Sequence, residues 1–412
     1  MPCPEGTASM ARTVGMALVV WLARLLYRAC CLFPQRRKIV LLSRQAARPL
    51  DFALLEPELS RRFPGRRIVW CCVAEIGRMS VSLMVRQIWH VATAELCLVD
   101  GYVPAVSLPK RHRSRVVQVW HALGAIKKFG YQALDTPAGR PSRIARELRM
   151  HRGYDLVIAG LPGAVPVFSE AFDVPEERIA ALGLPRVDYL RSTDPALSER
   201  RRRRFARADR VIAEAFAGES EEVLARPLVL YAPTFRKANA DAHWLGHAVA
   251  DLRRALAGAN VRLVVAGHPL ERAQDELGEE GAPVAFVHGV ATIDLLHAAA
   301  FVITDYSTVA FEAGFAERPV LFYVPDIDEY RLSPGLNIDP LRDLPSLSSR
   351  SASGLVPVIA GERPYDVAAF RAFMERKARG VSAGAIGRIA DTLEGLLGAQ
   401  GEEGVPCGQS EL

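Results

Sequence analysis

After residue 37, short apolar runs alternate along the chain with longer amphipathic stretches. Apolar runs of about four to eight residues are typical of buried strands, and stretches with apolar residues every three or four positions are typical of helices. The runs that indicate strands lie at 38–43, 67–73, 94–99, 115–120, 155–159, 227–231, 261–265, 284–287, 301–304 and 319–323. The stretches that indicate helices lie near 50–62, 79–92, 141–151, 195–217, 243–257, 291–299, 307–316, 363–378 and 385–398.

This alternation predicts an α/β protein with two consecutive βα series, each folded around a parallel sheet. The two series indicate an N-terminal Rossmann-like lobe at 38–190, a helical linker at 191–226, a C-terminal Rossmann-like lobe at 227–398 and a flexible tail at 399–412. The length of 412 residues suits two such lobes. Ligands of open α/β sheets bind beyond the carboxyl ends of the strands, so we expect the site in the cleft between the lobes.

The first 37 residues have a different pattern. Residues 14–23 are all apolar, and Arg24 and Arg28 then interrupt a second apolar stretch. A helix over 13–33 is long enough to cross a membrane, but it carries both arginines on one face, which favours an amphipathic helix lying in the membrane interface. A spanning helix and a buried first helix are the alternatives. A signal peptide is disfavoured, because the basic residues follow the apolar run.

Charge is concentrated in the same region. Residues 1–50 hold eight of the 52 Lys and Arg residues and one of the 46 acidic residues, a local charge of +7, which leaves the rest of the chain at −1. A neutral body argues against nucleic-acid binding, and the basic run at 36–38 favours an anionic membrane surface. Basic residues after the apolar segment place the body on the cytoplasmic side.

The 7 cysteines form no C-x-x-C pair. We therefore expect reduced thiols in a reducing compartment and no zinc site. A divalent cation could assist a phosphate reaction, but no cluster of carboxylates requires one.

Candidate chemistry follows several of the predicted strands. The motif WHALGAIKK follows the run 115–120, and it can place the His121 imidazole near a substrate and the Lys127 ammonium near phosphates. A structural histidine is an equal alternative for this motif alone. The motif YAPTFR follows the run 227–231, and Arg236 is a candidate phosphate ligand.

Two more motifs follow later strands. His268 stands in the motif GHP after the run 261–265, where the proline turns the chain. A hydroxyl-rich turn then opens a predicted helix, whose N-terminus would suit a diphosphate, although a hydroxyl there could equally be a plain N-cap. Glu312 lies one turn further and could accept ribose hydroxyls. The residues of the turn are Thr304, Asp305, Tyr306, Ser307 and Thr308.

One further motif, the arginine run 201–204, could bind phosphate, but a solvated helix face is the favoured interpretation.

Taken together, the motifs resemble the CDP-glycerol glycerophosphotransferase family, which includes teichoic-acid primases and polymerases. The similar segments are VWHALGAIKKFG, GLPRVDYL, YAPTFR, GHP and ITDYSTVAFEAGFAERPVLFY, within 115–340. Three positions depart from the family pattern: Ala122 replaces a glycine, Ala266 and Gly267 replace a lysine-containing pair, and RLSPGL replaces an aromatic segment.

The resemblance implies a GT-B-like fold with two facing lobes, and CDP bound mainly by the second. It implies transfer of an alditol phosphate, with glycerol phosphate as the leading candidate, from CDP-glycerol or a related CDP-alditol. The acceptor would be a hydroxyl of a lipid-linked glycan at the cytoplasmic face of a bacterial cell membrane, and CMP would be released.

The resemblance also assigns roles. His121 and His268 correspond to the two family histidines. We expect His121 to act as the base, because its lobe should face the acceptor, and His268 to stabilise the transferred phosphate or protonate the departing CMP. The turn at 304–308 and Arg236 would hold the diphosphate. The alternatives are a GT-B glycosyltransferase that uses a nucleotide sugar, and a degenerate, non-catalytic membrane scaffold.

Overall fold

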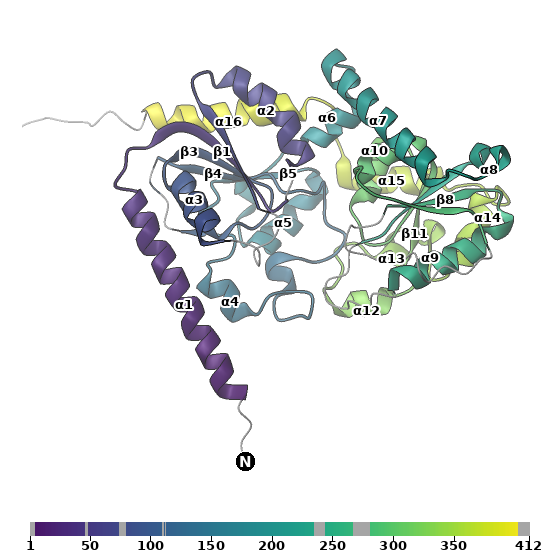
Figure 1. Ribbon diagram of the computed structural model, residues 1–412, viewed down its shortest axis with the longest axis horizontal. Coiled ribbons are helices and arrows are strands. Elements are labelled where there is room, and N and C mark those ends of the chain that lie inside the picture. The colour runs from purple at the N-terminus through teal and green to yellow at the C-terminus, as the bar shows by residue number, and fades with distance from the viewer. Residues whose placement is uncertain are drawn as a thin grey trace, which may run out of the picture.

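The computed structural model describes residues 5–45, 48–73, 80–108, 111, 113–234, 244–266 and 281–402. They form two lobes side by side, each built on a six-stranded sheet with helices around it (Figure 1). Every strand pair in both sheets is parallel. The predicted α/β architecture of two lobes is thus confirmed.

The N-terminal lobe has the strand order β2-β1-β3-β4-β5-β6. Its strands are β1 (Arg36–Ser43), β2 (Arg67–Cys72), β3 (Ala94–Val99), β4 (Arg115–Gln118), β5 (Leu156–Ala159) and β6 (Ile179–Ala181). Its helices are α1 (Glu5–Cys30), α2 (Leu50–Arg62), α3 (Val81–Ala92), α4 (Ser142–Glu147), α5 (Val165–Phe172) and α6 (Pro185–Arg191).

The C-terminal lobe has the strand order β12-β11-β10-β7-β8-β9. Its strands are β7 (Leu228–Ala232), β8 (Arg262–Ala266), β9 (Val284–Val287), β10 (Ala299–Thr304), β11 (Val320–Tyr323) and β12 (Ser348–Ser349). The helices from the linker onward are α7 (Pro195–Ala215), α8 (Glu221–Ala225), α9 (Trp244–Ala255), α10 (Thr292–Leu295), α11 (Val309–Phe315), α12 (Ile327–Leu332), α13 (Pro340–Asp343), α14 (Val356–Ile359), α15 (Val367–Ala378) and α16 (Ala385–Glu402).

The central strands are buried on both faces, which explains their uninterrupted apolar runs. The side chains from Ile39 to Leu42 in β1 and from Val229 to Tyr231 in β7 have no exposed surface. Parallel sheets covered by helices on both faces show this pattern, in place of strict alternation. The carboxyl ends of these strands face the gap between the lobes, so the loops that follow them are positioned for a shared site.

The end of the chain returns to the first lobe. Helix α16 packs against α2 and α6 of the N-terminal lobe, and Figure 1 shows it lying beside α2. The Asp188 carboxylate of α6 accepts hydrogen bonds from the backbone N–H groups of Gly384, Ala385 and Ile386, at 2.6, 2.9 and 2.8 Å. These groups are orphan donors at the start of α16, so Asp188 caps the helix and anchors it. Of the predicted tail, residues 399–402 belong to α16 and the rest lies outside the described residues.

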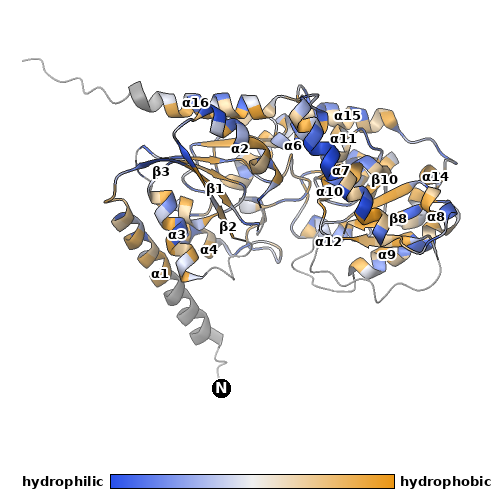
Figure 2. Ribbon diagram, turned by 45° about the horizontal axis from the view of Figure 1, so that its top comes forward, coloured by the Kyte–Doolittle hydropathy of each residue, from blue (hydrophilic) through white to orange (hydrophobic). Residues whose placement is uncertain are grey.

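Helix α1 projects from the N-terminal lobe, and its part from residue 18 to residue 30 carries mostly apolar residues (Figure 2). Its last turns pack on α3, where Tyr27 and Cys30 are buried. Across the residues described, no helix combines the length and the apolar character needed to cross a membrane.

One residue of the predicted basic run is placed differently. Lys38 lies in β1, is 4% exposed, and donates to Thr93 Oγ1 at 2.7 Å. Burial lowers the pKa of Lys38 to about 8. Lys38 therefore cannot meet a membrane, because the parallel sheet turns its side chain inward, whereas Arg36 and Arg37 remain exposed.

Five cysteines among the described residues are free thiols.

Candidate active site

A pocket of about 740 Å³ lies between the lobes, at the carboxyl end of the first sheet. Both lobes contribute polar side chains to it. Asp51 comes from α2, Arg186 from α6, Arg204 from α7 and Glu312 from α11. Its lining consists of Gln45, Arg48, Pro49, Leu50, Asp51, Phe52, Ala53, Glu56, Pro57, Asp100, His121, Arg186, Arg200, Arg204, Ala291, Thr292, Ile293 and Glu312. The structure thus brings two predicted site residues, His121 and Glu312, into one pocket.

His121 is held in one orientation by its backbone neighbour. Its Nδ1 atom lies 2.7 Å from the carbonyl oxygen of Asp100. A carbonyl oxygen only accepts hydrogen bonds, so Nδ1 carries the proton and Nε2 of the neutral ring has a free lone pair. His121 is an exposed residue, because its side chain lines the open pocket. Desolvation by neighbouring protein groups lowers the pKa of His121 to about 4, and the hydrogen bond to the Asp100 carbonyl opposes this shift.

The turn before His121 is unusual in its backbone. The predicted strand extends to Trp120, but β4 ends at Gln118, and Trp120 has a φ of 50°, in the left-handed region. A bulky residue is strained there and is kept in place by its surroundings. The Trp120 N–H donates to Gln118 Oε1 at 2.9 Å, and its ring stacks on Phe129 with centroids 4.8 Å apart. These contacts define the position of the imidazole.

Three charged side chains join the two lobes across the pocket. Arg186 of α6 contacts Asp51 of α2, with 2.9 Å from Nε to Oδ2, and also pairs with Glu312 of α11. All three are mostly buried. Burial lowers the pKa of Arg186, but the two neighbouring carboxylates outweigh this and raise it. Arg186 therefore stays charged, and its direct contact with Glu312 makes this an ion pair, although burial raises the pKa of the Glu312 carboxyl.

The predicted diphosphate turn at 304–308 adjoins α11 but lies outside the lining of this pocket. Asp305 is fully buried, and its Oδ1 accepts from the Thr234 hydroxyl at 2.6 Å and from the backbone N–H groups of Thr234 and Tyr306. Asp305 thereby ties this turn to the YAPT segment. Thr304 donates its hydroxyl to the Ala232 carbonyl at 2.7 Å.

The rest of the turn shows how α11 begins. Thr308 occupies the N-cap position of α11 without a side-chain capping bond, and the Ser307 hydroxyl accepts from Val309 N–H at 3.4 Å. The helix has 7 residues. Tyr306 stacks on Tyr330 with ring centroids 3.9 Å apart, and its hydroxyl donates to Asp326 at 3.0 Å.

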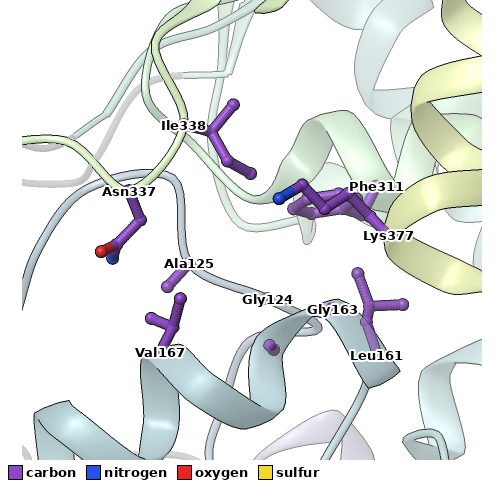
Figure 3. A pocket seen from close by; sticks show the side chains of 10 residues that line it. Gly124, Ala125, Leu161, Gly163, Val167, Phe311, Asn337, Ile338 and Lys377 are labelled. Atoms are coloured by element: carbon purple, nitrogen blue, oxygen red, sulfur yellow. The ribbon is translucent and has the colours of Figure 1, made fainter.

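The loop that carries Lys127 touches the opposite lobe directly. Lys127 forms an isolated antiparallel bridge with Leu336, and the Ile126 carbonyl accepts from the backbone N–H groups of Asn337 and Ile338, at 2.8 and 3.1 Å. Figure 3 shows the narrow pocket between this loop and the C-terminal lobe, with Gly124 and Asn337 among its lining residues. A Cβ at Gly124 would lie 3.0 Å from the Phe311 ring, so this glycine allows the lobes to approach closely.

The arginine run of α7 is divided between surface and interior. Arg202 and Arg203 are exposed and pair with Glu199, as the solvated-face interpretation expects. Arg204 instead reaches the buried carboxylate of Asp294 at 2.6 Å and lines the pocket, and Arg201 donates to three backbone carbonyls.

Arg236 and His268 lie outside the described residues, so their predicted roles stay predictions. Within the described ranges, no three His, Cys, Asp or Glu side chains lie close enough together to hold a metal ion.

Two residues of the pocket, Asp51 and Asp100, were not predicted from the sequence, because neither belongs to a recognisable motif. Arg186 lies in the segment GLPRVDYL, to which the sequence analysis gives no role. The similarity of that segment to the family was the signal that could have identified Arg186 as a site residue.

Two lobes with parallel sheets and a pocket between them define the chain as GT-B-like in fold. The structure is similar to the wall teichoic acid polymerase TagF, with a TM-score of 0.65 at 18% identity, covering 96% of this chain and 99% of that chain. It is also similar to S. aureus MnaA in complex with UDP, with a TM-score of 0.51 at 13% identity, covering 91% of this chain and 100% of that chain.

Comparisons of sequence are more specific. Over 328 residues the chain is 30% identical to the teichoic acid ribitol-phosphate primase of Bacillus spizizenii, covering 78% of this chain and 80% of the primase. It is 26% identical over 294 residues to the teichoic acid glycerol-phosphate primase of Bacillus subtilis, covering 71% of each. Residues 25–394 match the family described as CDP-glycerol:poly(glycerophosphate) glycerophosphotransferase. The chain belongs to that family and is a phosphotransferase of the CDP-glycerol type.

Proposed function

We propose that this protein transfers an alditol phosphate from a CDP-alditol to a hydroxyl of a lipid-linked glycan during teichoic acid synthesis, releasing CMP. The observation that carries the proposal is His121, whose free Nε2 lone pair faces the pocket between the lobes. Family membership supplies the donor class, and the names of the relatives supply the polymer. Glycerol phosphate is our leading candidate for the transferred group, and both glycerol- and ribitol-phosphate primases are among the relatives.

In the proposed reaction the acceptor hydroxyl attacks the β-phosphorus of the CDP-alditol. The new O–P bond forms as the bond to the CMP oxygen breaks. His121 Nε2 takes the hydroxyl proton, because the hydroxyl is a poor nucleophile until it loses that proton. With a pKa near 4 the empty site holds His121 neutral. An anionic substrate beside the ring raises that pKa, because opposite charge stabilises the imidazolium that forms.

We also propose that α1 lies in a membrane interface on the cytoplasmic side. Trp21, Leu22 and Leu25 are each about half exposed on α1, at 57%, 49% and 52%. Phe33 adds to this apolar surface. The exposed residues Arg28 and Arg37 adjoin it and suit anionic headgroups. A lipid-linked acceptor would be presented at the same surface.

The test is incubation of the full-length protein with CDP-glycerol or CDP-ribitol and a membrane lipid extract, with detection of CMP. We expect CMP from one of the two donors and none without the extract. The His121→Asn variant should release none above background. Release of a nucleoside diphosphate from a nucleotide sugar, with no CMP from either CDP-alditol, would contradict the proposal and favour the glycosyltransferase alternative.

A further inference from the structure

Two arginines flank the segment that orients His121. This segment, Asp100 to Tyr102, follows β3 directly. The Arg44 side chain, which follows β1, lies against Gly101, since a Cβ at Gly101 would be 3.6 Å from Arg44 Cδ. The Arg140 guanidinium lies over the Tyr102 ring, with 5.5 Å from its carbon to the ring centroid. The Asp100 carbonyl holds His121. The side chains of Arg44, Arg140 and His121 therefore all contact the short segment from Asp100 to Tyr102.

In the part of the chain that the structure describes, neither the Arg44 nor the Arg140 guanidinium forms an ion pair with a carboxylate, and the buried Nε of Arg44 has no hydrogen-bond partner. Burial lowers the pKa of Arg44, and the charge of Arg140 lowers it further. Arg186, with two carboxylates, shows how this protein neutralises a buried guanidinium elsewhere.

One carboxylate, Asp100, lies close enough to Arg44 for its charge to raise the pKa of that guanidinium and offset part of the lowering. Asp100 is 5% exposed, and its Oδ2 accepts from the Ser43 hydroxyl at 2.7 Å. Two partly buried guanidinium groups with one such carboxylate between them still carry a net positive charge, which a bound anion would balance. Planar N–H groups of this kind suit phosphate oxygens.

We propose that Arg44 and Arg140 form a phosphate subsite for the acceptor on the segment that orients His121, next to the pocket that His121 lines. The proposal rests on the proposed function. The acceptor side is favoured because both arginines belong to the N-terminal lobe and share the Asp100–Tyr102 segment with His121, which acts on the acceptor hydroxyl. The diphosphate of the CDP donor is the other source of the same chemistry, and the experiment distinguishes the two.

The experiment is calorimetric titration of the full-length protein with inorganic pyrophosphate, with and without saturating CDP. The variants are Arg44→Gln and Arg140→Gln. The matched control is Arg143→Gln, because Arg143 is exposed, lies close to Arg140 in sequence and pairs only with Glu147. We expect each subsite variant to bind pyrophosphate at least about tenfold more weakly in the presence of CDP, and the control to match the wild type.

The outcomes separate the two proposals. If CDP abolishes pyrophosphate binding in the wild type, the subsite belongs to the donor and the acceptor assignment is overturned. Unchanged binding by both Gln variants, with CMP still released by the wild type, overturns the subsite alone. Thermal unfolding shows whether each variant is folded, and Arg140→Lys, which keeps the charge but loses the planar fork, should give an intermediate affinity.

Discussion

One hydrogen bond gives His121 the tautomer that our proposed base needs. The Asp100 carbonyl fixes the proton on Nδ1, and desolvation keeps the ring neutral. Replacement by Asn keeps an N–H donor for the Asp100 carbonyl and removes the base. We therefore expect His121→Asn to lower kcat by about 10²- to 10⁴-fold without changing the free energy of unfolding by much. Steady-state CMP release and urea unfolding measure the two quantities.

The pH dependence offers a second measure of the same residue. Because the pKa of His121 in the free enzyme is about 4, the acid limb of kcat/KM that belongs to this base should lie near pH 4 and not near 6.5. Activity falls as pH falls, since protonation removes the lone pair. Turnover by His121→Asn close to that of the wild type would exclude His121 as the base.

His151 makes the fold sensitive to acid. It is 3% exposed, and its Nδ1 accepts from the Tyr154 hydroxyl at 3.0 Å, because that hydroxyl itself accepts from Gln118 Nε2. Burial lowers the pKa of His151 from 6.5 to about 3. Between these values the unfolded chain binds more protons, so the free energy of unfolding falls as the pH falls through this window.

We expect this histidine to cost about 2 kcal/mol of stability at pH 5 relative to pH 8. His151→Asn should reduce the loss, because Asn keeps an acceptor near the position of Nδ1 and tolerates the left-handed φ of 58°. Urea unfolding at both pH values measures the effect. An equal loss in variant and wild type would show that other groups cause it.

At the scale of elements, α6 connects three parts of the molecule. Its Arg186 reaches α2 and α11, and its Asp188 caps α16. Asp188→Ala leaves three N–H groups at the start of α16 without an acceptor. We expect the free energy of unfolding to fall by about 2 kcal/mol, since a single N-cap is worth about 1.

The control for this prediction is Asp194→Ala. Asp194 is exposed and caps α7 through one bond, to Leu197 N–H at 2.9 Å, so its loss should be smaller. Both variants are compared by urea unfolding at pH 7. Equal losses would mean that the cap on α16 has no special role in joining the chain end to the first lobe.

The elements themselves were largely predictable from the sequence. Buried parallel strands such as β1 and β7 are uninterrupted apolar runs, so their places could be assigned. β6 and β12 were not predicted, because strands of 3 and 2 residues have no periodicity. Trp120 was assigned to a strand because an aromatic residue after an apolar run favours one, and only the hydrogen bond to Gln118 reveals the turn.

The candidate site was less predictable than the fold. Motifs at strand ends identified His121 and Glu312, since topology brings such ends to one edge of a sheet. The pairing of Arg186 with Asp51 joins residues 135 positions apart, and no local pattern records a contact of that kind.

For the whole molecule, the position of α1 relative to the two lobes would set how the enzyme meets the proposed acceptor. The pocket opens between the lobes, while the apolar surface of α1 belongs to the N-terminal lobe, the same lobe that supplies His121. A membrane held by α1 would therefore deliver a lipid-linked hydroxyl to the lobe that carries the base. Experiments can separate the two contributions to membrane binding by α1, which are the burial of apolar side chains and the attraction of arginines to anionic headgroups.

We expect the triple variant Trp21→Ser, Leu22→Ser and Leu25→Ser to bind anionic vesicles at least about tenfold more weakly, because it removes the apolar area that the interface would bury. These side chains are about half exposed, so the fold should persist. A matched control changes three exposed apolar residues elsewhere, Leu224, Leu332 and Val367, to Ser. High salt should weaken wild-type binding but not abolish it, since salt screens the arginines and leaves apolar burial intact. Equal vesicle binding by the two triple variants in a sedimentation assay would exclude α1 as the attachment surface.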